Sequence, residues 1–274
     1  MKEHAKKFKD DPVLRSGANQ ICQNSYVDDI LVLTNEESQL ENDVENVNHI
    51  LELASLPTHK YVSNSAKTLE KFPKEKLSEK DRVSILGTIW TPESDLITFN
   101  FVKSPLTQQE TDVKNQSITK RNLLSLLAKI FDAMGILSAY TILAKITLQK
   151  TWERKIPWDE PLKDDLLQEA QAFLSEASYL ENLQLPRCFL NTKDSKIKEV
   201  ATFADASSRA YAAVVYVISV DPDGKRHSHL AFAKSKVRPL GKRLQSLSDE
   251  MSVVRMELLG ALLAAKIGTM VASA

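Results

Sequence analysis

Apolar residues recur with a helical period over much of the chain before about residue 190. Between residues 36 and 56 they follow three- and four-residue steps, which predicts an amphipathic helix. That stripe consists of Leu40, Val44, Val47, Leu51 and Ala54. Two further helices, separated at Gly135, are expected between residues 120 and 152. Pro161 suits the first turn of another helix that reaches about Asn182.

The hydrophobic period changes to two after the polar stretch 192–198, which predicts a domain boundary there. The expected strands span residues 199–205, 210–220 and 227–233. The turn at 221–224 joins the last two strands, and a helix follows from about Ser248 to Ala265. Because the second and third strands form a hairpin beside the first, we expect the strand that ends at Asp205 to be the central one.

Two shorter patterns before residue 102 predict β-hairpins. In the first, strand-like runs at 21–26 and 30–33 flank the pair Asp28-Asp29, which would present both carboxylates at the tip. In the second, strand patterns at 84–90 and 96–101 flank a polar turn. The chain as a whole is therefore predicted to be of the α+β class.

Composition is that of a globular protein, with 274 residues, 43% apolar and 26% charged, which leaves room for about two domains. Cys22 and Cys188 are the two cysteines, so neither a disulfide framework nor a cysteine-based zinc site is indicated. No apolar stretch has membrane-spanning length, and residues 1–11 are polar rather than signal-like. We expect no membrane partner and an intracellular, cytoplasmic location.

The net charge of zero hides four alternating blocks. Residues 1–102 carry 12 basic and 17 acidic side chains (−5), and residues 103–155 carry 9 and 4 (+5). Residues 156–195 carry 3 and 8 (−5), and residues 196–274 carry 12 and 7 (+5). The two positive blocks could follow a phosphate backbone. They could equally balance a solvated surface.

Tyr26-Val27-Asp28-Asp29 is the first candidate for chemistry. Carboxylate oxygens suit hard cations such as Mg²⁺ or Mn²⁺, and two such ions can clamp the reacting oxygens of a phosphoryl transfer. An isolated Asp-Asp pair is more often a solvated turn. Tyr-x-Asp-Asp followed by an aliphatic strand is narrower, and it resembles the active-site motif of reverse transcriptases.

Further motifs follow this one in a fixed order. They are Ile85-Leu86-Gly87, Thr119-Lys120-Arg121-Asn122, Phe131-Asp132-Ala133-Met134-Gly135, Trp158-Asp159-Glu160-Pro161, Phe203-Ala204-Asp205-Ala206-Ser207 and Met256-Glu257-Leu258-Leu259. From about Gln20 to about Lys266 the series resembles the pol polyprotein of BEL/Pao-type LTR retrotransposons. Three departures from the family pattern are Ala133 and Ala139 in place of proline, and Val254 in place of the proline before Arg255.

This resemblance implies three regions. Residues 1–102 would be the late part of a reverse-transcriptase palm with a primer-grip-like hairpin, and residues 103–195 a helical thumb and connection. Residues 196–274 would be a truncated ribonuclease H-like sheet with one helix. The complete family protein is an RNA-directed DNA polymerase with ribonuclease H, uses Mg²⁺ or Mn²⁺, and acts on an RNA/DNA template-primer or hybrid alongside the remainder of the polyprotein.

The resemblance also assigns site residues. Asp28, Asp29, Asp205 and Glu257 would be catalytic metal ligands. The nucleic-acid contacts would be Tyr26, Leu86, Gly87, Lys120, Arg121, Lys145 and Lys150. For Gly87, a bulge in a structural hairpin is the competing interpretation. For Lys120, Arg121, Lys145 and Lys150, which lie in the first positive block, the competing interpretation is a solvated surface.

Glu257 can also be weighed without the family. It is the only charged residue between Met256 and Ala265, and helical spacing places it on one stripe with Val253, Val254, Ala261 and Leu262. A buried carboxylate is costly unless it is paired or coordinates a metal. Metal ligation is therefore favoured over a solvated glutamate, and Asp205 is expected within about 4–6 Å of it, as for ligands of one shared cation.

Other features have simpler interpretations. His227 and His229 share a strand face without a third ligand, so an exposed pair is expected rather than a metal site. Trp152 and Trp158 are expected to be core anchors rather than base-stacking platforms. Neither Asp-Thr-Gly nor Asp-Ser-Gly occurs, which argues against an aspartic protease.

Two functional classes remain open at this stage. The first is a reverse transcriptase and ribonuclease H segment that acts by metal-assisted phosphoryl transfer in the complete protein. The second is a non-catalytic nucleic-acid-binding remnant. Motifs for fingers, for an earlier palm aspartate and for later ribonuclease carboxylates are missing, so we expect a pol fragment that is inactive as an isolated chain.

Overall fold

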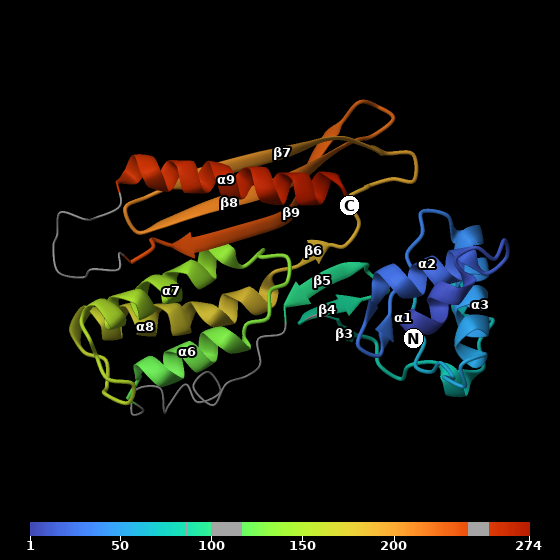
Figure 1. Ribbon diagram of the computed structural model, residues 1–274, viewed down its shortest axis with the longest axis horizontal. Helices are drawn as coiled ribbons and strands as arrows, with labels where there is room; N and C mark the ends of the chain where they lie inside the picture. The colour runs from blue at the N-terminus through green and yellow to red at the C-terminus, as the bar shows by residue number, and fades with distance from the viewer. Residues whose placement is uncertain (86, 100–116, 241–251) are drawn as a thin grey trace. The chain divides into compact units, whose positions relative to one another are not determined.

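A computed structural model describes residues 1–85, 87–99, 117–240 and 252–274 (Figure 1). Helices and sheets are both present, so the α+β prediction is confirmed. Internal contacts divide the chain into two compact units. Unit 1 comprises residues 1–83 and 91–94, and unit 2 comprises residues 84–90 and 95–274. The predicted boundary at 102/103 lies outside the described residues.

Unit 1 is built mainly from short helices around a small core. Its elements are α1 (Lys2–Ala5), η1 (Lys6–Phe8), α2 (Arg15–Asn24), β1 (Ser25–Tyr26), β2 (Asp29–Ile30), α3 (Glu37–Glu52), α4 (Ala66–Leu69) and η2 (Lys74–Lys76). The buried core residues are Ala5, Ala18, Ile21, Val47, Ile50 and Leu51. The helix predicted between residues 36 and 56 is confirmed as α3, which packs against α2.

The first predicted hairpin is present, but its strands are much shorter than expected. The run 21–24, predicted as strand, forms the end of α2, and β2 ends at Ile30. Ala18 and Ile21 lie three residues apart and are both fully buried. Helical spacing places them on one face against α3, and that packing decides the local structure.

The second predicted hairpin contributes to a small four-stranded sheet. Its strands are β3 (Val83–Ile85), β4 (Thr88–Thr91), β5 (Leu96–Phe99) and β6 (Leu185–Pro186), in the order β3-β4-β5-β6. The single strand expected at 84–90 is wrong, because the chain turns near Gly87, whose φ is +78°. The end of the second expected strand, residues 100 and 101, lies outside the described residues.

The helical layer of unit 2 consists of α6 (Lys120–Lys129), α7 (Ser138–Glu153), α8 (Asp164–Glu176) and η3 (Ala177–Asn182). The helices pack around Ile118, Leu123, Leu126, Ala144, Leu148, Leu162, Leu166, Ala170, Phe173 and Leu174. The predicted break between two helices at Gly135 is confirmed. Pro161 is not in the first turn of α8, since it forms a β-bridge with Thr119 three residues before that helix begins.

The second sheet of unit 2 contains β7 (Lys196–Ala206), β8 (Ala210–Val220) and β9 (Arg226–Val237), all antiparallel. Helix α9 (Val253–Ala272) lies across it (Figure 1). The three predicted strands and the helix are confirmed, although the expected helix start at 248–251 lies outside the described residues. The expectation that the strand of Asp205 is central is wrong for the described strands. Both connections are hairpins, so β8 is in the middle and β7 at an edge.

The two faces of this sheet have different neighbours. Tyr211, Ala213 and Val215 of β8 pack against Met256, Leu263 and Ile267 of α9. On the opposite face, the Ser235 hydroxyl of β9 donates a hydrogen bond to the Ser138 carbonyl of α7, at 3.0 Å. Ser235 is paired with Ala212, so strand alternation places it away from α9. The sheet is thus covered by α9 on one face and, at β9, by α7 on the other.

Candidate metal and nucleic-acid sites

The Tyr26-Val27-Asp28-Asp29 segment forms a tight antiparallel hairpin. Tyr26 pairs with Asp29, and Val27 and Asp28 form the turn, with Val27 at a φ of +55°. Both carboxylates are exposed. Tyr26 and Val27 are also exposed, at 52% and 79%. The predicted presentation of acid at a hairpin tip is therefore confirmed, and the role of these residues stays a prediction.

Asp205 lies near the end of β7, and Glu257 lies in the second turn of α9. Both side chains are exposed. The buried face of α9 is formed by Met256, Gly260, Leu263 and Ile267. The predicted stripe of Val253, Val254, Ala261 and Leu262 is instead solvent-exposed. Met256, rather than Glu257, takes the position over the sheet, so Glu257 lies at the flank of the buried face.

The main chains that carry these two carboxylates lie close together. A Cβ placed on Gly260 would be 3.6 Å from the Asp205 carbonyl oxygen. A Cβ on Gly268 would be 2.8 Å from the Thr202 hydroxyl oxygen of β7. Gly268 lies about three turns after Glu257 on the same side of α9. The flank of α9 that carries Glu257 therefore faces β7.

The Asp205 side chain, however, emerges on the other face of the sheet. Asp205 pairs with Ala212, whereas Ala204 pairs with the core residue Ala213. Strand alternation therefore directs Asp205 away from α9. The two carboxylates lie at the same end of β7 on either side of its edge, and the expected 4–6 Å separation stays a prediction. Their oxygen donors suit Mg²⁺ or Mn²⁺. Among the described residues, no group of three or more His, Cys, Asp or Glu side chains could hold a metal ion.

Lys120 lies inside the helical layer rather than on a phosphate-binding surface. Its side chain is 5% exposed. Its ammonium lies 3.9 Å from the centre of the Trp152 ring and 4.9 Å from that of Trp158, and it donates to the Ile156 carbonyl at 3.4 Å. The predicted contact of Lys120 with nucleic acid does not fit this position, because the Lys120 ammonium already makes cation–π contacts with two aromatic rings.

The tryptophans around Lys120 are not buried anchors. Trp152 and Trp158 are 42% and 41% exposed, and their rings meet edge to face with centres 5.6 Å apart. The prediction of core anchors is therefore only partly right. Their inner faces enclose Lys120 while a substantial part of each ring contacts solvent.

Two other basic residues that were predicted to contact nucleic acid have carboxylate partners. Arg121 donates two hydrogen bonds to Asp159, at 2.6 and 2.9 Å, and this pairing raises the Arg121 pKa and lowers that of Asp159. Lys150 pairs with Glu169 of α8. The pair Arg121–Asp159 is exposed and could exchange with solvent or phosphate, whereas Lys150 links two helices.

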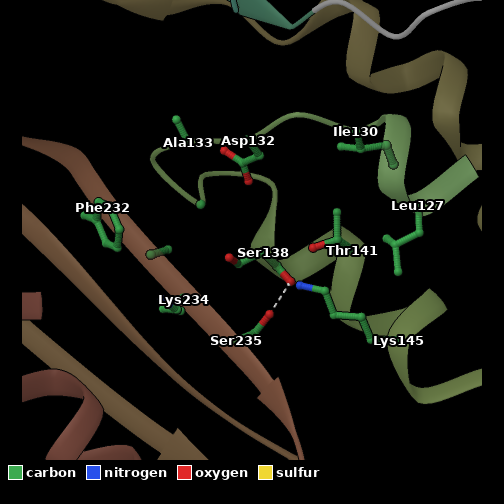
Figure 2. A pocket seen from close by; sticks show the side chains of 12 residues that line it. Leu127, Ile130, Asp132, Ala133, Ser138, Thr141, Lys145, Phe232, Lys234 and Ser235 are labelled. Carbon is green, nitrogen blue, oxygen red and sulfur yellow. Dashed lines mark hydrogen bonds between the residues drawn. The ribbon is translucent and has the colours of Figure 1, made fainter. Parts of the chain in front are cut away.

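Lys145 differs from these three residues because it lines a cavity (Figure 2). The cavity has a volume of about 240 Å³ and lies between α6, α7 and β9. Burial, and then repulsion from Lys234, lowers the Lys145 pKa, while Asp132 opposes that shift. Burial also raises the pKa of Asp132, against hydrogen bonds from backbone N–H groups. Charged groups of both signs are thus partly desolvated at one place.

The remaining predicted nucleic-acid contacts concern the second hairpin. Leu86 lies outside the described residues. A Cβ on Gly87 would lie 2.5 Å from the Phe131 side chain. This close approach supports the structural interpretation of Gly87, in which it makes room for a neighbouring side chain.

The paired histidines are half-buried, not exposed as predicted. His227 hydrogen-bonds through Nε2 with Asp221 at 2.7 Å, and Ser195 donates to the same carboxylate at 2.6 Å. His229 lies against Phe189, with ring centres 5.9 Å apart. The segment before β7 covers this end of the sheet, which sequence periodicity could not indicate. No metal site involves these histidines among the described residues.

Comparison with known protein families identifies the family of this chain. A protein-family model described as the Pao retrotransposon-like RNaseH-like domain matches residues 119–274. The match spans 156 of 274 residues, more than half of the chain. The chain belongs to this family. The Pao match begins at the N-cap of α6, so it includes helices α6 to α8 as well as the β7–β9 sheet and α9. No curated protein matches.

The Pao family match confirms the retrotransposon part of the resemblance, while residues 1–118, with the reverse-transcriptase-like motif, lie outside it. Within the part of the chain that is described, no helix has the length and hydrophobicity needed to cross a membrane. The site that sequence analysis missed in this Pao-family chain is the cavity at Lys145. Its signal in the sequence was Asp132, the one charged residue of the turn Asp132–Gly135 between two helices.

Proposed function

We propose that this Pao-family chain is part of a retrotransposon pol protein whose ribonuclease H-like region acts on RNA/DNA hybrid. The observation that carries the proposal is the family match over a sheet and helix that bring Asp205 and Glu257 to the same end of one strand. Both carboxylates are exposed, so a nucleic-acid backbone could reach them.

In this proposal, Asp205 and Glu257 would hold Mg²⁺ or Mn²⁺ at the edge of β7. The bound ion would polarise the scissile phosphodiester and activate water. The residues themselves supply hard oxygen donors, fix the position of the ion relative to the sheet, and leave one side of the strand edge open to substrate. Exposed Arg121 would contribute a charge that can exchange its Asp159 partner for phosphate.

We further propose that residues 1–102 derive from a reverse-transcriptase palm, with Asp28 and Asp29 as its metal-binding pair and Tyr26 beside them. The tight, exposed hairpin supports this assignment. No third carboxylate joins the pair among the described residues, so the isolated chain should hold metal weakly there. We expect it not to extend a primer, and Asp28→Asn should make no difference in a primer-extension assay.

Binding of hybrid without cleavage is a second candidate function. It is favoured by a specific observation, since the described residues gather no group of three or more metal ligands. Two exposed carboxylates on either side of a strand edge would bind a divalent ion poorly. In this case the chain would hold nucleic acid while a more complete active site did the chemistry.

A single assay separates these functions. The chain is incubated with RNA/DNA hybrid labelled on the RNA strand, in Mn²⁺, and both binding and cleavage are measured. The variants are Asp205→Asn, Glu257→Gln and, as a matched control, Asp223→Asn in the exposed β8–β9 turn. We expect binding with cleavage near background. Cleavage lost in the first two variants alone would establish the hydrolase, and absence of both binding and cleavage would contradict both functions.

A further inference from the structure

The cavity between the helical layer and the β7–β9 sheet is a candidate binding site that the carboxylate chemistry does not use. Its lining comes from the end of α6, the following turn, the first half of α7 and the end of β9. Its volume of about 240 Å³ is below the roughly 300–1,000 Å³ of pockets for drug-sized ligands. A small ion or a single ligand group would fit.

One face of α7 presents polar groups to this cavity. Ser138, Thr141 and Lys145 are spaced by three and four residues, which places them on a single side of the helix. All three line the cavity, and Figure 2 shows their side chains on the side of α7 that faces β9. Ser138 and Thr141 can donate hydroxyl hydrogen bonds, and Lys145 can donate from a charged ammonium.

The charge of Lys145 is not neutralised by direct pairing. Among the described residues, its ammonium has no hydrogen bond or ion pair. The nearby Asp132 carboxylate is engaged elsewhere, because its two oxygens accept the N–H groups of Ile136 and Leu137 at 2.9 and 2.8 Å. Lys234 of β9 repels Lys145 from outside the cavity, because strand alternation turns its side chain to the α9 face. The unpaired Lys145 ammonium therefore favours a negatively charged ligand.

We propose that this cavity binds one phosphate group, with Lys145 as its charge partner and the hydroxyls of Ser138 and Thr141 as hydrogen-bond donors. A phosphate group offers several acceptor oxygens to such donors, and its charge complements that of Lys145. A metal cation would be repelled by the same ammonium. The group could be a phosphodiester of a nucleic-acid strand or a free phosphate.

The site shares no residue with the proposed metal ligands Asp205 and Glu257. It therefore stands independently of the proposed hydrolase function. The cavity also joins two parts of the Pao-family region, since its walls come from α7 and from β9. A phosphate bound there would bridge the helical layer and the sheet.

The test uses the full chain and inorganic phosphate as the probe, at constant ionic strength in chloride. Dissociation constants are measured by calorimetry for the unchanged protein, Lys145→Met, Thr141→Val and the control Lys266→Met, an exposed lysine of α9. Lys145→Met should weaken binding roughly tenfold or more, as for loss of a charged hydrogen bond. Thr141→Val should weaken it less, and Lys266→Met should leave it unchanged.

Two results would overturn the proposal. One is the absence of saturable phosphate binding by the unchanged protein. The other is equal affinity of Lys145→Met, Thr141→Val and the unchanged protein, with folding of each variant verified by circular dichroism. A labelled RNA/DNA hybrid then identifies the source of the phosphate group. Weaker hybrid binding by Lys145→Met than by Lys266→Met indicates a phosphodiester, and equal hybrid binding with lost phosphate binding indicates a free phosphate.

Discussion

At the scale of single residues, the turn from Asp132 to Gly135 connects the helical layer to the sheet. The Asp132 carboxylate accepts two backbone N–H groups at the start of α7. The Ala233 N–H of β9 donates to the Met134 carbonyl at 2.9 Å. Gly135 has a φ of +70° and lies directly against the Ala233 carbonyl. Asp132, Met134 and Gly135 therefore have separate structural tasks, and Asp132, Ala133 and Gly135 line the cavity.

Gly135→Ala should destabilise the protein strongly. A Cβ there would lie 1.7 Å from the Ala233 carbonyl oxygen, in a left-handed backbone conformation. We expect a loss of at least about 2 kcal/mol in the free energy of unfolding, measured with urea. Gly224→Ala is the matched control, since its φ is +86° but nothing lies within 4 Å of the added Cβ. It should cost only about 1 kcal/mol. Equal losses in the two variants would refute the steric argument.

His229 should make stability depend on pH near neutrality. Burial, and then the positive charge of His227, lowers the pKa of His229 in the folded state. In the unfolded chain the pKa of His229 is about 6.5, so the unfolded chain binds more protons than the folded chain. The contribution of neutral His229 to the free energy of unfolding should therefore be fully present above about pH 6.5. It should be lost as the pH falls through the lowered pKa of the folded state. The ionisable groups beside His229 are His227 and Asp221, which pair with each other.

The measurement is the urea midpoint of unfolding between pH 7.5 and 5, with tryptophan fluorescence as the signal. His229→Phe preserves an aromatic contact with Phe189 and removes the titrating group, so the midpoint should fall less steeply with acid. An identical slope in the variant and the unchanged protein would show that His229 is not responsible.

At the scale of elements, sequence periodicity predicted the long elements and failed on the short ones. Helix α3, strands β7 to β9 and helix α9 each repeat their hydrophobic pattern over ten or more residues. The wrong predictions of secondary structure concern residues 21–24, 84–90 and Pro161. These are short segments, where contacts with distant residues decide the conformation. The strand order was also wrong, since β8 and not β7 lies in the middle of the described sheet.

Site residues were predictable as positions along elements but not in their surroundings. Asp205 and Glu257 lie on the expected strand and helix, yet the buried face of α9 is centred on Met256 and not on the predicted stripe. Lys120 was predicted to contact nucleic acid, with a solvated surface as the alternative, because its charge is obvious in the sequence. Its aromatic partners are 32 and 38 residues away, at Trp152 and Trp158. No local pattern encodes such a contact.

Lys120→Met should lower stability without weakening hybrid binding. The variant keeps the long aliphatic stem and removes the ammonium that lies over Trp152 and Trp158. We expect a loss of about 1–2 kcal/mol in the free energy of unfolding, as for a desolvated cation–π contact. Lys129→Met, an exposed lysine on the same helix, should stay within about 0.5 kcal/mol of the unchanged protein. Weaker hybrid binding by Lys120→Met at unchanged stability would support the predicted contact of Lys120 with nucleic acid.

At the scale of the whole molecule, the two units have separate hydrophobic cores. The core of unit 1 contains Ile21, Ile50 and Leu51, and unit 2 contains one core in its helical layer and one under α9. Hydrogen bonds within unit 2 join its two cores, including that from the Gln149 side chain to the Arg238 carbonyl at 2.5 Å. Unit 2 also holds the entire family match. It therefore has the internal contacts of an independently folding segment.

Residues 84–274 should fold without residues 1–83. All three tryptophans, Trp90, Trp152 and Trp158, lie in this segment, so fluorescence reports on unit 2 even in the full chain. We expect the urea midpoint by fluorescence to be the same for the segment and for the full chain, because the cores of unit 2 use none of the residues removed. Far-ultraviolet circular dichroism of the full chain should show an additional transition from unit 1. A segment that lacks cooperative unfolding, or whose midpoint falls well below that of the full chain, would mean that residues 1–83 contribute to the stability of the Pao-family region.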